Sequence, residues 1–267
     1  MNASQVHAVV AAGLENPTLI ERWRQEPELL RNCGVDPAIV DLDALWKFAG
    51  LTTKVRHNGL RGDLPLTFRL LNVAGLEIEV FASYASSRAA EGRSYASTSE
   101  ARSQDLLMFL EQWLDVDNHA HALLWDLMRH ELTLSRLRKV CQSAEGVTAD
   151  QSLVQPHLRG NTVPRVSGEL ALHEMRSDPR VIEKLLRRKR PNLREASIGK
   201  HYFGYWRKSN ELFVLQLDEL AFYLLSMIDG KRSTADLSYL INVRRRPTPA
   251  LLHALGELAS IGIIAVA

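Results

Sequence analysis

Residues 201–267 constrain the fold of this chain most strongly, because they predict a strand hairpin followed by three helices. Alternating aromatic and aliphatic residues over 201–217 predict two strands, and Lys208-Ser209-Asn210 is a natural turn between them. Helix signals and a final apolar run then place three helices and a closing strand at residues 218–228, 234–243, 248–262 and 263–266. This is the order of elements in a winged-helix domain.

The front half of the chain predicts a helical domain. Asn16-Pro17 and Asp36-Pro37 are helix starts, because Asn and Asp accept hydrogen bonds from free N–H groups and Pro fits the first turn. We expect Gly50 to end the second of these helices. Two amphipathic helices are expected further on, with apolar stripes that consist of Leu106, Leu107, Leu110, Trp113 and Leu114 and of Leu123, Leu124, Leu127, Met128 and Leu134.

The residues from 76 to 99 are less decisive. Apolar alternation over 76–84 fits a strand, but the spacing of Leu76, Val80 and Tyr84 also fits a helix, which we favour. Residues 83–99 are rich in Ser, Gly, Arg and Ala, and this composition predicts a loop.

A linker is predicted at residues 143–168, where Gly and Pro are spread through a stretch with little apolar periodicity. We therefore expect a helical domain at residues 1–145 and a winged-helix domain at residues 165–267. The predicted fold class is mainly α with a small β-sheet.

Charge is distributed unevenly between the two halves. Residues 1–150 contain 15 Lys and Arg against 20 Asp and Glu, a net charge of −5, and residues 151–267 contain 18 against 11, a net charge of +7. This contrast suggests two modules with different partners, the basic one attracting an anionic partner such as nucleic acid or an acidic peptide.

The sequence favours a cytoplasmic location. No apolar run approaches the roughly 20 residues that a membrane span needs, and residues 1–5 lack the basic and apolar regions of a signal peptide. Cys33 and Cys141 form no disulfide or metal-finger pattern. We expect both to be small buried hydrophobic residues, with a reactive thiol as the alternative.

The histidines offer a metal site only weakly. Metal ligands on one helix are typically three or four residues apart, whereas His119 and His121 are two apart and His130-Glu131 lies farther along. Solvated or capping histidines are the simpler interpretation. The chain also contains no GxSxG, P-loop or GxGxxG motif. We therefore expect that the chain is not an enzyme and that it has no catalytic residue, metal or cofactor of its own.

Two basic runs, residues 187–190 and 244–246, fit either a solvated charged face or DNA binding. A DNA-reading helix needs polar and basic side chains that reach base edges. The last helix, residues 250–258, offers no Arg, Lys, Asn or Gln and presents Glu257. A winged-helix DNA-binding regulator is therefore the second hypothesis.

Peptide capture is the remaining use of such a fold. An extended peptide adds a strand to the edge of a sheet and places apolar side chains against a helix. Some of the apolar residues predicted for this site must also fill the core of the domain. The predicted peptide-binding residues are the strand residues Glu211, Leu212, Phe213, Val214, Leu215 and Leu217, the helix residues Leu251, Leu252, Leu255 and Leu258, and the cations Arg244 and Arg245.

Residues 213–237 resemble the PqqD-like recognition element of ribosomal peptide natural-product pathways, with a strand, a helix, an Asp229-Gly230 turn and a further helix start. The front half is similar to the partner proteins of multinuclear iron oxidative enzymes, as in the methanobactin and 3-thiaglutamate pathways. The residues behind this second resemblance are Asn16-Pro17, Trp23, residues 64–68, Phe81 with Tyr84, and His130-Glu131.

The resemblance implies a division of labour. A separate TIM-barrel iron enzyme performs the oxidation and holds the iron. This chain binds the leader of a ribosomal precursor or carrier peptide, docks on the enzyme as a heterodimer and presents the C-terminal cysteine of the peptide. In the 3-thiaglutamate pathway the reaction excises the β-carbon of that cysteine. A self-sufficient metalloenzyme that uses His119, His121, His130 and Glu131 is the third and least favoured hypothesis.

Overall fold

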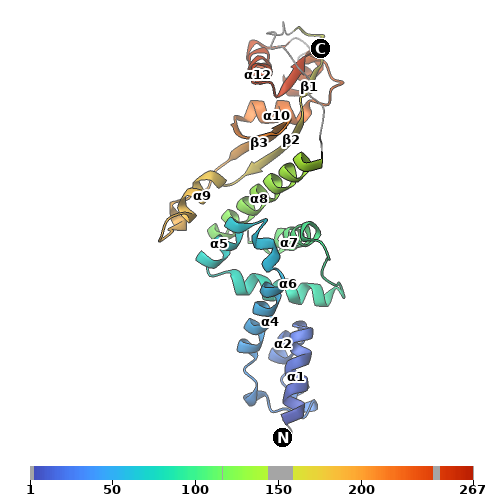
Figure 1. The fold of residues 1–267 in the computed structure, drawn as a ribbon, viewed down its shortest axis with the longest axis vertical. Coiled ribbons are helices and arrows are strands. Elements are labelled where there is room, and N and C mark those ends of the chain that lie inside the picture. Colours follow the sequence, from blue (N-terminus) through green and yellow to red (C-terminus); the bar gives the residue numbers. More distant parts are fainter. Residues whose placement is uncertain (1–2, 116, 144–158, 243–246, 267) are drawn as a thin grey trace. The chain divides into compact units, whose positions relative to one another are not determined.

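A computed structural model describes residues 3–115, 117–143, 159–242 and 247–266 (Figure 1). Its described residues are mainly α-helical, with two small antiparallel β-sheets. The chain divides into two compact units, and neither unit is one continuous segment. Unit 1 comprises Met1–Leu132 and Pro179–Ala196, and unit 2 comprises Thr133–Asp178 and Ser197–Ala267.

Unit 1 is built from helices. Helix α8 begins in unit 1 and continues into unit 2 after Leu132. The elements that contribute to unit 1 are α1 Ala3–Glu15, α2 Thr18–Gln25, α3 Glu28–Asn32, η1 Pro37–Ile39, α4 Leu42–Arg56, η2 Asn58–Arg61, α5 Pro65–Val73, α6 Glu77–Ala90, α7 Ser99–Trp113, α8 His119–Ser143, α9 Pro179–Leu186 and η3 Leu193–Glu195.

Local side-chain hydrogen bonds explain several helix starts in unit 1. The Asn16 carboxamide accepts a hydrogen bond from the Thr18 N–H at 3.2 Å and so helps to start α2. The Asp36 carboxylate caps the short turn η1 by accepting from the Ala38 N–H at 3.0 Å. Both predicted starts are thus confirmed, although Asp36 begins a single 3₁₀ turn and Asp41 caps the helix that follows.

Gly50 does not end α4, so this prediction is wrong. The helix continues to Arg56. Gly50 is the position at which α6 crosses α4 at close range. A Cβ atom at this position would lie 2.6 Å from the Ile78 carbonyl oxygen and 2.9 Å from the Ala82 Cβ. Glycine is therefore required here for helix packing and not for chain reversal.

Helix α6 confirms the helical choice for residues 76–84 and corrects the predicted loop at residues 83–99. The helix extends to Ala90, and its small residues Ala85 and Ser86 are buried while Ser83 and Ala89 are half-buried. The predicted amphipathic helices are confirmed as α7 and α8. Cys33 is exposed, contrary to the expected burial, and the side chain of Cys141 lies outside the described residues.

Unit 2 contains an antiparallel sheet in the order β2-β3-β4, formed by β2 Glu169–Met175, β3 His201–Lys208 and β4 Glu211–Leu217. A second, two-stranded sheet pairs β1 Pro164–Val166 with β5 Ile264–Val266. Three helices lie between β4 and β5 in the sequence, namely α10 Glu219–Met227, α11 Thr234–Asn242 and α12 Pro249–Ser260. Hairpin, three helices and closing strand therefore occur in the predicted order.

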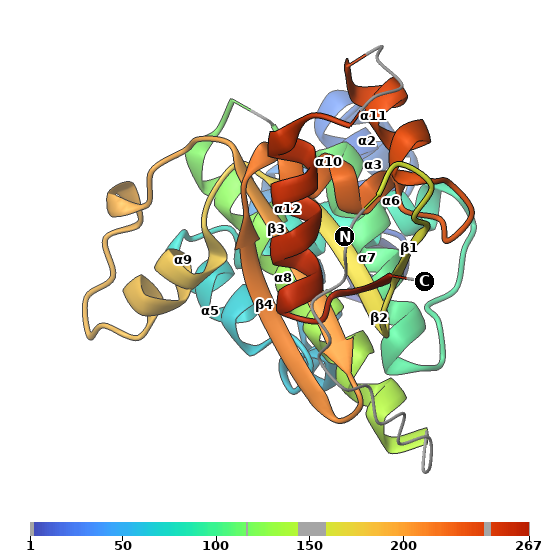
Figure 2. The ribbon, with the colours of Figure 1, turned by 90° about the horizontal axis from the view of Figure 1, so that it is seen from above.

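Apolar residues cover both faces of the three-stranded sheet. On one face, Trp206, Leu215 and Leu217 pack with residues of α10 and α12, and Figure 2 shows these helices crossing the strands. On the other face, Phe203 and Tyr205 pack with Leu137 from the unit 2 part of α8. The sheet thus forms the middle of three layers within unit 2.

The predicted linker at 143–168 contains strand β1, because Pro164–Val166 pairs with β5, the last strand in the sequence. Residues 144–158 of this segment lie outside the described residues. Strand β2 was not predicted either. It pairs with β3 over its full length, from Glu169↔Arg207 to Met175↔His201. Short strands of this kind depend on distant partners.

The unit boundaries differ from the expected ranges 1–145 and 165–267, and this changes the charge argument. Residues 179–196, which include the basic run 187–190, belong to unit 1. Unit 1 therefore contains 19 Lys and Arg against 20 Asp and Glu, and unit 2 contains 14 against 11. The contrast of −5 and +7 between sequence halves falls to −1 and +3 between units.

Over the residues that the structure describes, no helix combines the length and the apolar character that crossing a bilayer requires.

Candidate functional site

Strand β4 forms an edge of the three-stranded sheet, since β3 is its only strand neighbour among the described residues. The hairpin closes on the pair Lys208↔Glu211 with two residues between them. A two-residue loop closes on a hydrogen-bonded pair, and bonded and non-bonded pairs then alternate along an antiparallel ladder. The backbone N–H and C=O groups of Leu212, Val214 and Gln216 therefore point to the edge, away from β3.

The side chains of β4 divide between the two faces of the sheet. Leu212 and Val214 pack into the cluster around Phe203 and Tyr205. Phe213, on the other face, is 37% exposed and stacks on Trp206 with the ring centroids 5.1 Å apart. An added strand would find its apolar contacts beside Phe213, because this is the exposed large apolar side chain of the strand.

The predicted helix residues divide differently. Leu251, Leu255 and Leu258 are buried in the core of unit 2, where they pack with Leu224. Leu252 is the predicted leucine of α12 that remains partly exposed. The spacing of these leucines indicated an apolar face correctly, but the fold directs most of that face inward.

Trp206 anchors the hairpin end of this edge. Its indole N–H donates to the Ser167 carbonyl oxygen at 2.5 Å, and the Lys208 ammonium lies 5.9 Å from the ring centroid. The turn itself uses Ser209 at φ 53°, a left-handed conformation that tight hairpin loops require. An aromatic platform with one nearby cation is thus built next to the open strand.

The cations predicted for this site are only partly described. Arg244 and Arg245 lie outside the described residues. In the loop before α11, Arg232 forms an ion pair with Asp229 at 3.4 Å. Hydrogen bonds from the backbone N–H groups of Arg232 and Lys231 lower the pKa of the Asp229 carboxyl, which therefore stays ionised and fixes the turn.

The histidines of the metalloenzyme hypothesis are engaged in structural contacts. His119 Nε2 lies 2.8 Å from the Ala196 carbonyl oxygen. His121 Nδ1 accepts from the Asp115 N–H at 3.1 Å, and its ring packs on Trp113 with centroids 4.8 Å apart. Within the described parts of the chain, no group of three or more His, Cys, Asp or Glu is placed to hold a metal ion.

Glu131 caps a helix from a distant part of the sequence. Its two carboxylate oxygens accept from the N–H groups of Leu66 at 2.9 Å and Thr67 at 2.7 Å, at the start of α5. Burial raises the pKa of this carboxyl. His130 is buried as well. The His130-Glu131 pair thus contributes to the packing of unit 1.

A buried cluster of one histidine and three aromatic rings at the end of α4 was not predicted from the sequence. The His57 ring lies 5.6, 5.3 and 5.1 Å from the rings of Phe81, Tyr84 and Tyr95. His57 Nδ1 lies 2.7 Å from the Thr53 carbonyl oxygen and therefore carries the proton, while Nε2 is buried without a hydrogen-bond partner. Burial, reinforced by nearby arginines, lowers the pKa of His57, so the ring stays neutral.

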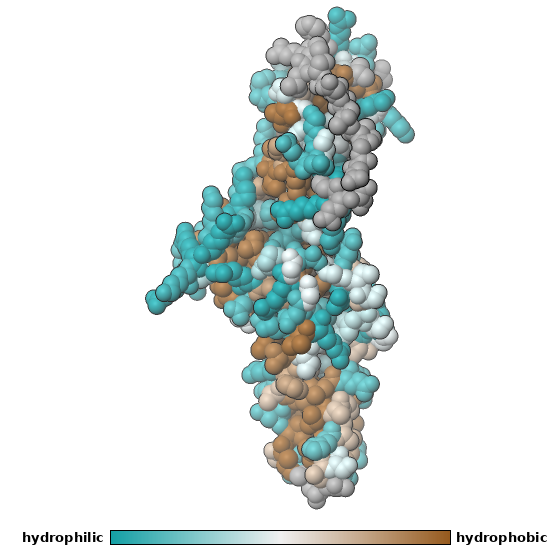
Figure 3. Space-filling model, in the orientation of Figure 1, coloured by the Kyte–Doolittle hydropathy of each residue, from teal (hydrophilic) through white to brown (hydrophobic). Residues whose placement is uncertain are grey.

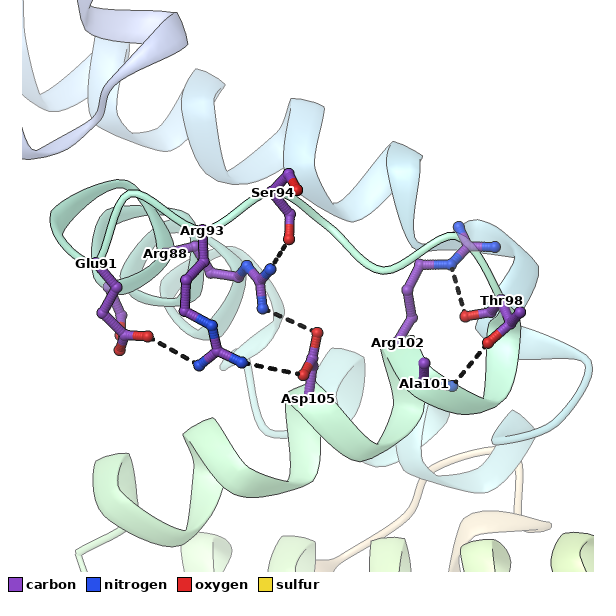
Figure 4. Close-up of polar contacts among 9 residues, drawn as sticks. Arg88, Glu91, Arg93, Ser94, Thr98, Ala101, Arg102 and Asp105 are labelled. Atoms are coloured by element: carbon purple, nitrogen blue, oxygen red, sulfur yellow. Dashed lines mark hydrogen bonds and ion pairs between the residues drawn. The ribbon is translucent and has the colours of Figure 1, made fainter.

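Arg88 ties the neighbouring loop to α6 and α7 (Figure 4). Its guanidinium bonds the Ser94 carbonyl oxygen and the Asp105 carboxylate, the latter at 2.9 Å. Arg93 reaches the same carboxylate at 3.6 Å and pairs with Glu91 at 2.9 Å. A buried arginine needs such partners, and nothing in the sequence spacing indicated that these residues meet.

Comparison with protein-family models and with curated proteins finds no match to this chain. The geometry described above is accordingly the basis for assigning a function.

Proposed function

We propose that this chain is a non-catalytic partner subunit that binds the leader of a ribosomal precursor or carrier peptide. The observation that supports this best is the open edge of β4, where Leu212 and Val214 direct backbone groups outward beside exposed Phe213. Such an edge supplies affinity through main-chain hydrogen bonds, and neighbouring side chains supply selectivity.

The resemblance of the sequence to PqqD-like recognition elements and to partners of iron oxidative enzymes extends the proposal. In this proposal, unit 1 docks on a TIM-barrel multinuclear iron enzyme, which holds the iron and performs the oxidation. The chain acts in the cytoplasm and presents the C-terminal cysteine of the peptide for β-carbon excision. Iron analysis of the chain purified without its partner is expected to give much less than one iron atom per chain.

A winged-helix DNA-binding regulator is the alternative. The outward face of α12 carries His253 and Glu257, which lie 3.5 Å apart, and the acid opposes approach to phosphates. We expect at most weak, strongly salt-dependent binding to random duplex DNA. Tight binding that persists at high salt would favour the regulator instead.

A proline substitution in β4 tests the proposed peptide site. Val214→Pro removes an edge-facing N–H without breaking the ladder to β3, because proline is tolerated where the N–H of an edge strand faces outward. Val214→Ala is the matched control, since it shortens the side chain but keeps the N–H. Titration of a labelled synthetic leader peptide of the proposed carrier-peptide class should show loss of affinity in Val214→Pro and much less in Val214→Ala.

The two variants also separate folding from binding. Circular dichroism should show both folded. Equal affinity of the folded Val214→Pro variant and the Val214→Ala variant for the leader would contradict strand addition at β4. The peptide would then bind elsewhere, and the proposed function would lose its main structural support.

A further inference from the structure

Helix α4 carries an apolar stripe on the side that faces away from the core of unit 1. The stripe consists of Ala44, Phe48, Leu51 and Val55, and we call it the α4 stripe. Phe48, Leu51 and Val55 are 50%, 40% and 58% exposed, and Ala44 is exposed as well. Figure 3 shows apolar side chains at the surface in the part of unit 1 that contains α1 to α4.

The stripe is separate from the face of α4 that fills the core. Leu45, Ala49 and Thr53 are buried and belong to the inward face. At 100° per residue, the members of the α4 stripe fall within a narrow sector on the opposite side. Surface helices typically have one apolar face, so a second one marks a surface that another molecule covers.

The spacing of the stripe indicates what covers it. Ala44, Phe48, Leu51 and Val55 are four, three and four residues apart. This is the spacing of a coiled-coil seam, in which apolar residues of one helix fit between those of another helix. A helix with apolar residues at the same alternation of three and four therefore fits the stripe better than an extended peptide, whose side chains alternate every second residue.

The charged residues beside the stripe indicate which side chains the covering helix should carry on its flanks. Lys47 and Lys54 border the stripe on one side, and Thr52 borders it on the other. Lys54 is held by Glu77 at 2.7 Å, and Lys47 is exposed. An antiparallel second copy would bring the lysine borders of both copies together, which is unfavourable. Carboxylates on the covering helix would instead pair with Lys47.

We propose that the α4 stripe docks an amphipathic helix of another protein, with a three-four apolar repeat and carboxylates on its flanks. This inference deepens the proposed function and rests on it for the identity of that protein, the oxidative enzyme. The chemistry of the surface itself rests on the exposure, spacing and charge of residues 44–55.

Two synthetic helices of about three heptads provide the probe. Both carry leucine along the seam, one with glutamate and the other with lysine at the flanking positions. Fluorescence anisotropy with the full chain should show tighter binding of the glutamate peptide. Leu51→Gln should weaken that binding by about tenfold or more, because it removes the centre of the seam. Met108→Gln changes another exposed apolar residue of unit 1, 48% exposed, and should leave binding unchanged.

Lys47→Glu tests the charge argument, since it should reverse the preference to the lysine peptide. Failure to bind either peptide, equal affinity for both, or an unchanged affinity in Leu51→Gln would each overturn the proposal. Sedimentation of the chain alone gives a further test. A dimer that Leu51→Gln dissociates would show that a second copy covers the stripe, and would also overturn it.

Titration with the leader peptide distinguishes this inference from the proposed function. Leu51→Gln should bind the leader with the affinity of the wild type, because β4 and α4 belong to different units. A chain that binds the glutamate helix but no leader peptide would refute the proposed function and leave the docking surface standing.

Discussion

Helices α4 and α12 both carry apolar stripes, but the two stripes face opposite environments. On α12, Leu251, Leu255 and Leu258 are buried in the core of unit 2. On α4, Phe48, Leu51 and Val55 are exposed, while Leu45 and Ala49 fill the core. The sequence of α12 suggested a binding surface, whereas the sequence of α4 predicted a helix with no binding role. In the structure the exposed stripe is the one on α4, and the stripe on α12 is buried.

The comparison teaches that apolar spacing identifies a face of a helix but not the side on which that face lies. Helix α12 covers a sheet whose facing side chains include Trp206 and Leu215, so its stripe is needed inside. Helix α4 is apolar on two sides, and its neighbours in unit 1 cover only one of them. Burial in the tertiary structure therefore decides which stripe is available for binding.

Leu255→Ala should produce the largest effect. Leu255 has no exposed surface, and the truncation of a buried leucine typically costs about 2–5 kcal/mol of unfolding free energy. Leu252→Ala, on the same helix but partly exposed, is the control and should cost clearly less. Urea denaturation measures both. Equal, small losses would mean that the α12 stripe is not a core face, and the comparison with α4 would fail.

Gly50→Ala tests the buried side of α4. Alanine normally stabilises a helix relative to glycine, but here its Cβ would lie 2.6 Å from the Ile78 carbonyl oxygen. We expect a net loss of about 1–3 kcal/mol from overpacking, measured by urea denaturation. Gly59→Ala is a matched control, because a Cβ there meets nothing within 4 Å. A stabilised Gly50→Ala protein would show that α4 and α6 are not in close contact.

His57 should make unit 1 sensitive to acid. Its folded-state pKa is lowered below the ordinary value of 6.5, chiefly by burial and also by Arg102, Arg88 and Arg56. The unfolded chain therefore binds the proton more tightly, and the stability present above pH 6.5 is lost as the pH falls toward the folded-state pKa.

The measurement compares wild type with His57→Phe, whose ring can occupy the aromatic surroundings without titrating. Urea denaturation at a series of pH values should show a smaller loss of stability on acidification in His57→Phe. The buried Glu131 titrates with the opposite sign, since its pKa is raised, so only the difference between the two proteins is informative. Identical pH dependence would show that His57 is not buried in the neutral form.

Leu51→Gln should have the smallest effect on stability. Leu51 is 40% exposed, and substitutions at such positions typically change the unfolding free energy by no more than about 0.5 kcal/mol. Glutamine also keeps a high helix propensity. The same variant is expected to lose the docking of the helical peptide, so stability and binding separate on α4. A loss of several kcal/mol would place Leu51 in the core and remove the contrast with α12.

Local signals were sufficient for much of the fold. Asn16 lies at the start of α2 as predicted, and Thr248 and the Ser233/Asp236 capping box cap helices at the expected positions, because a cap and the N–H group that it binds are two or three residues apart. The hairpin of β3 and β4 was also predicted, since its turn and its alternation lie within one short segment. These features depend on neighbours in the sequence.

Other features depend on residues far apart in the sequence, and only the tertiary structure decides them. Strand β1 exists because β5 lies beside it, and Gly50 is required because α6 crosses there. The basic segment 187–190 belongs to unit 1 through the packing of Ile182, Leu185 and Leu186 into its core. Whether a stripe faces the core or solvent follows from which elements surround it, and periodicity along one helix contains no record of those neighbours.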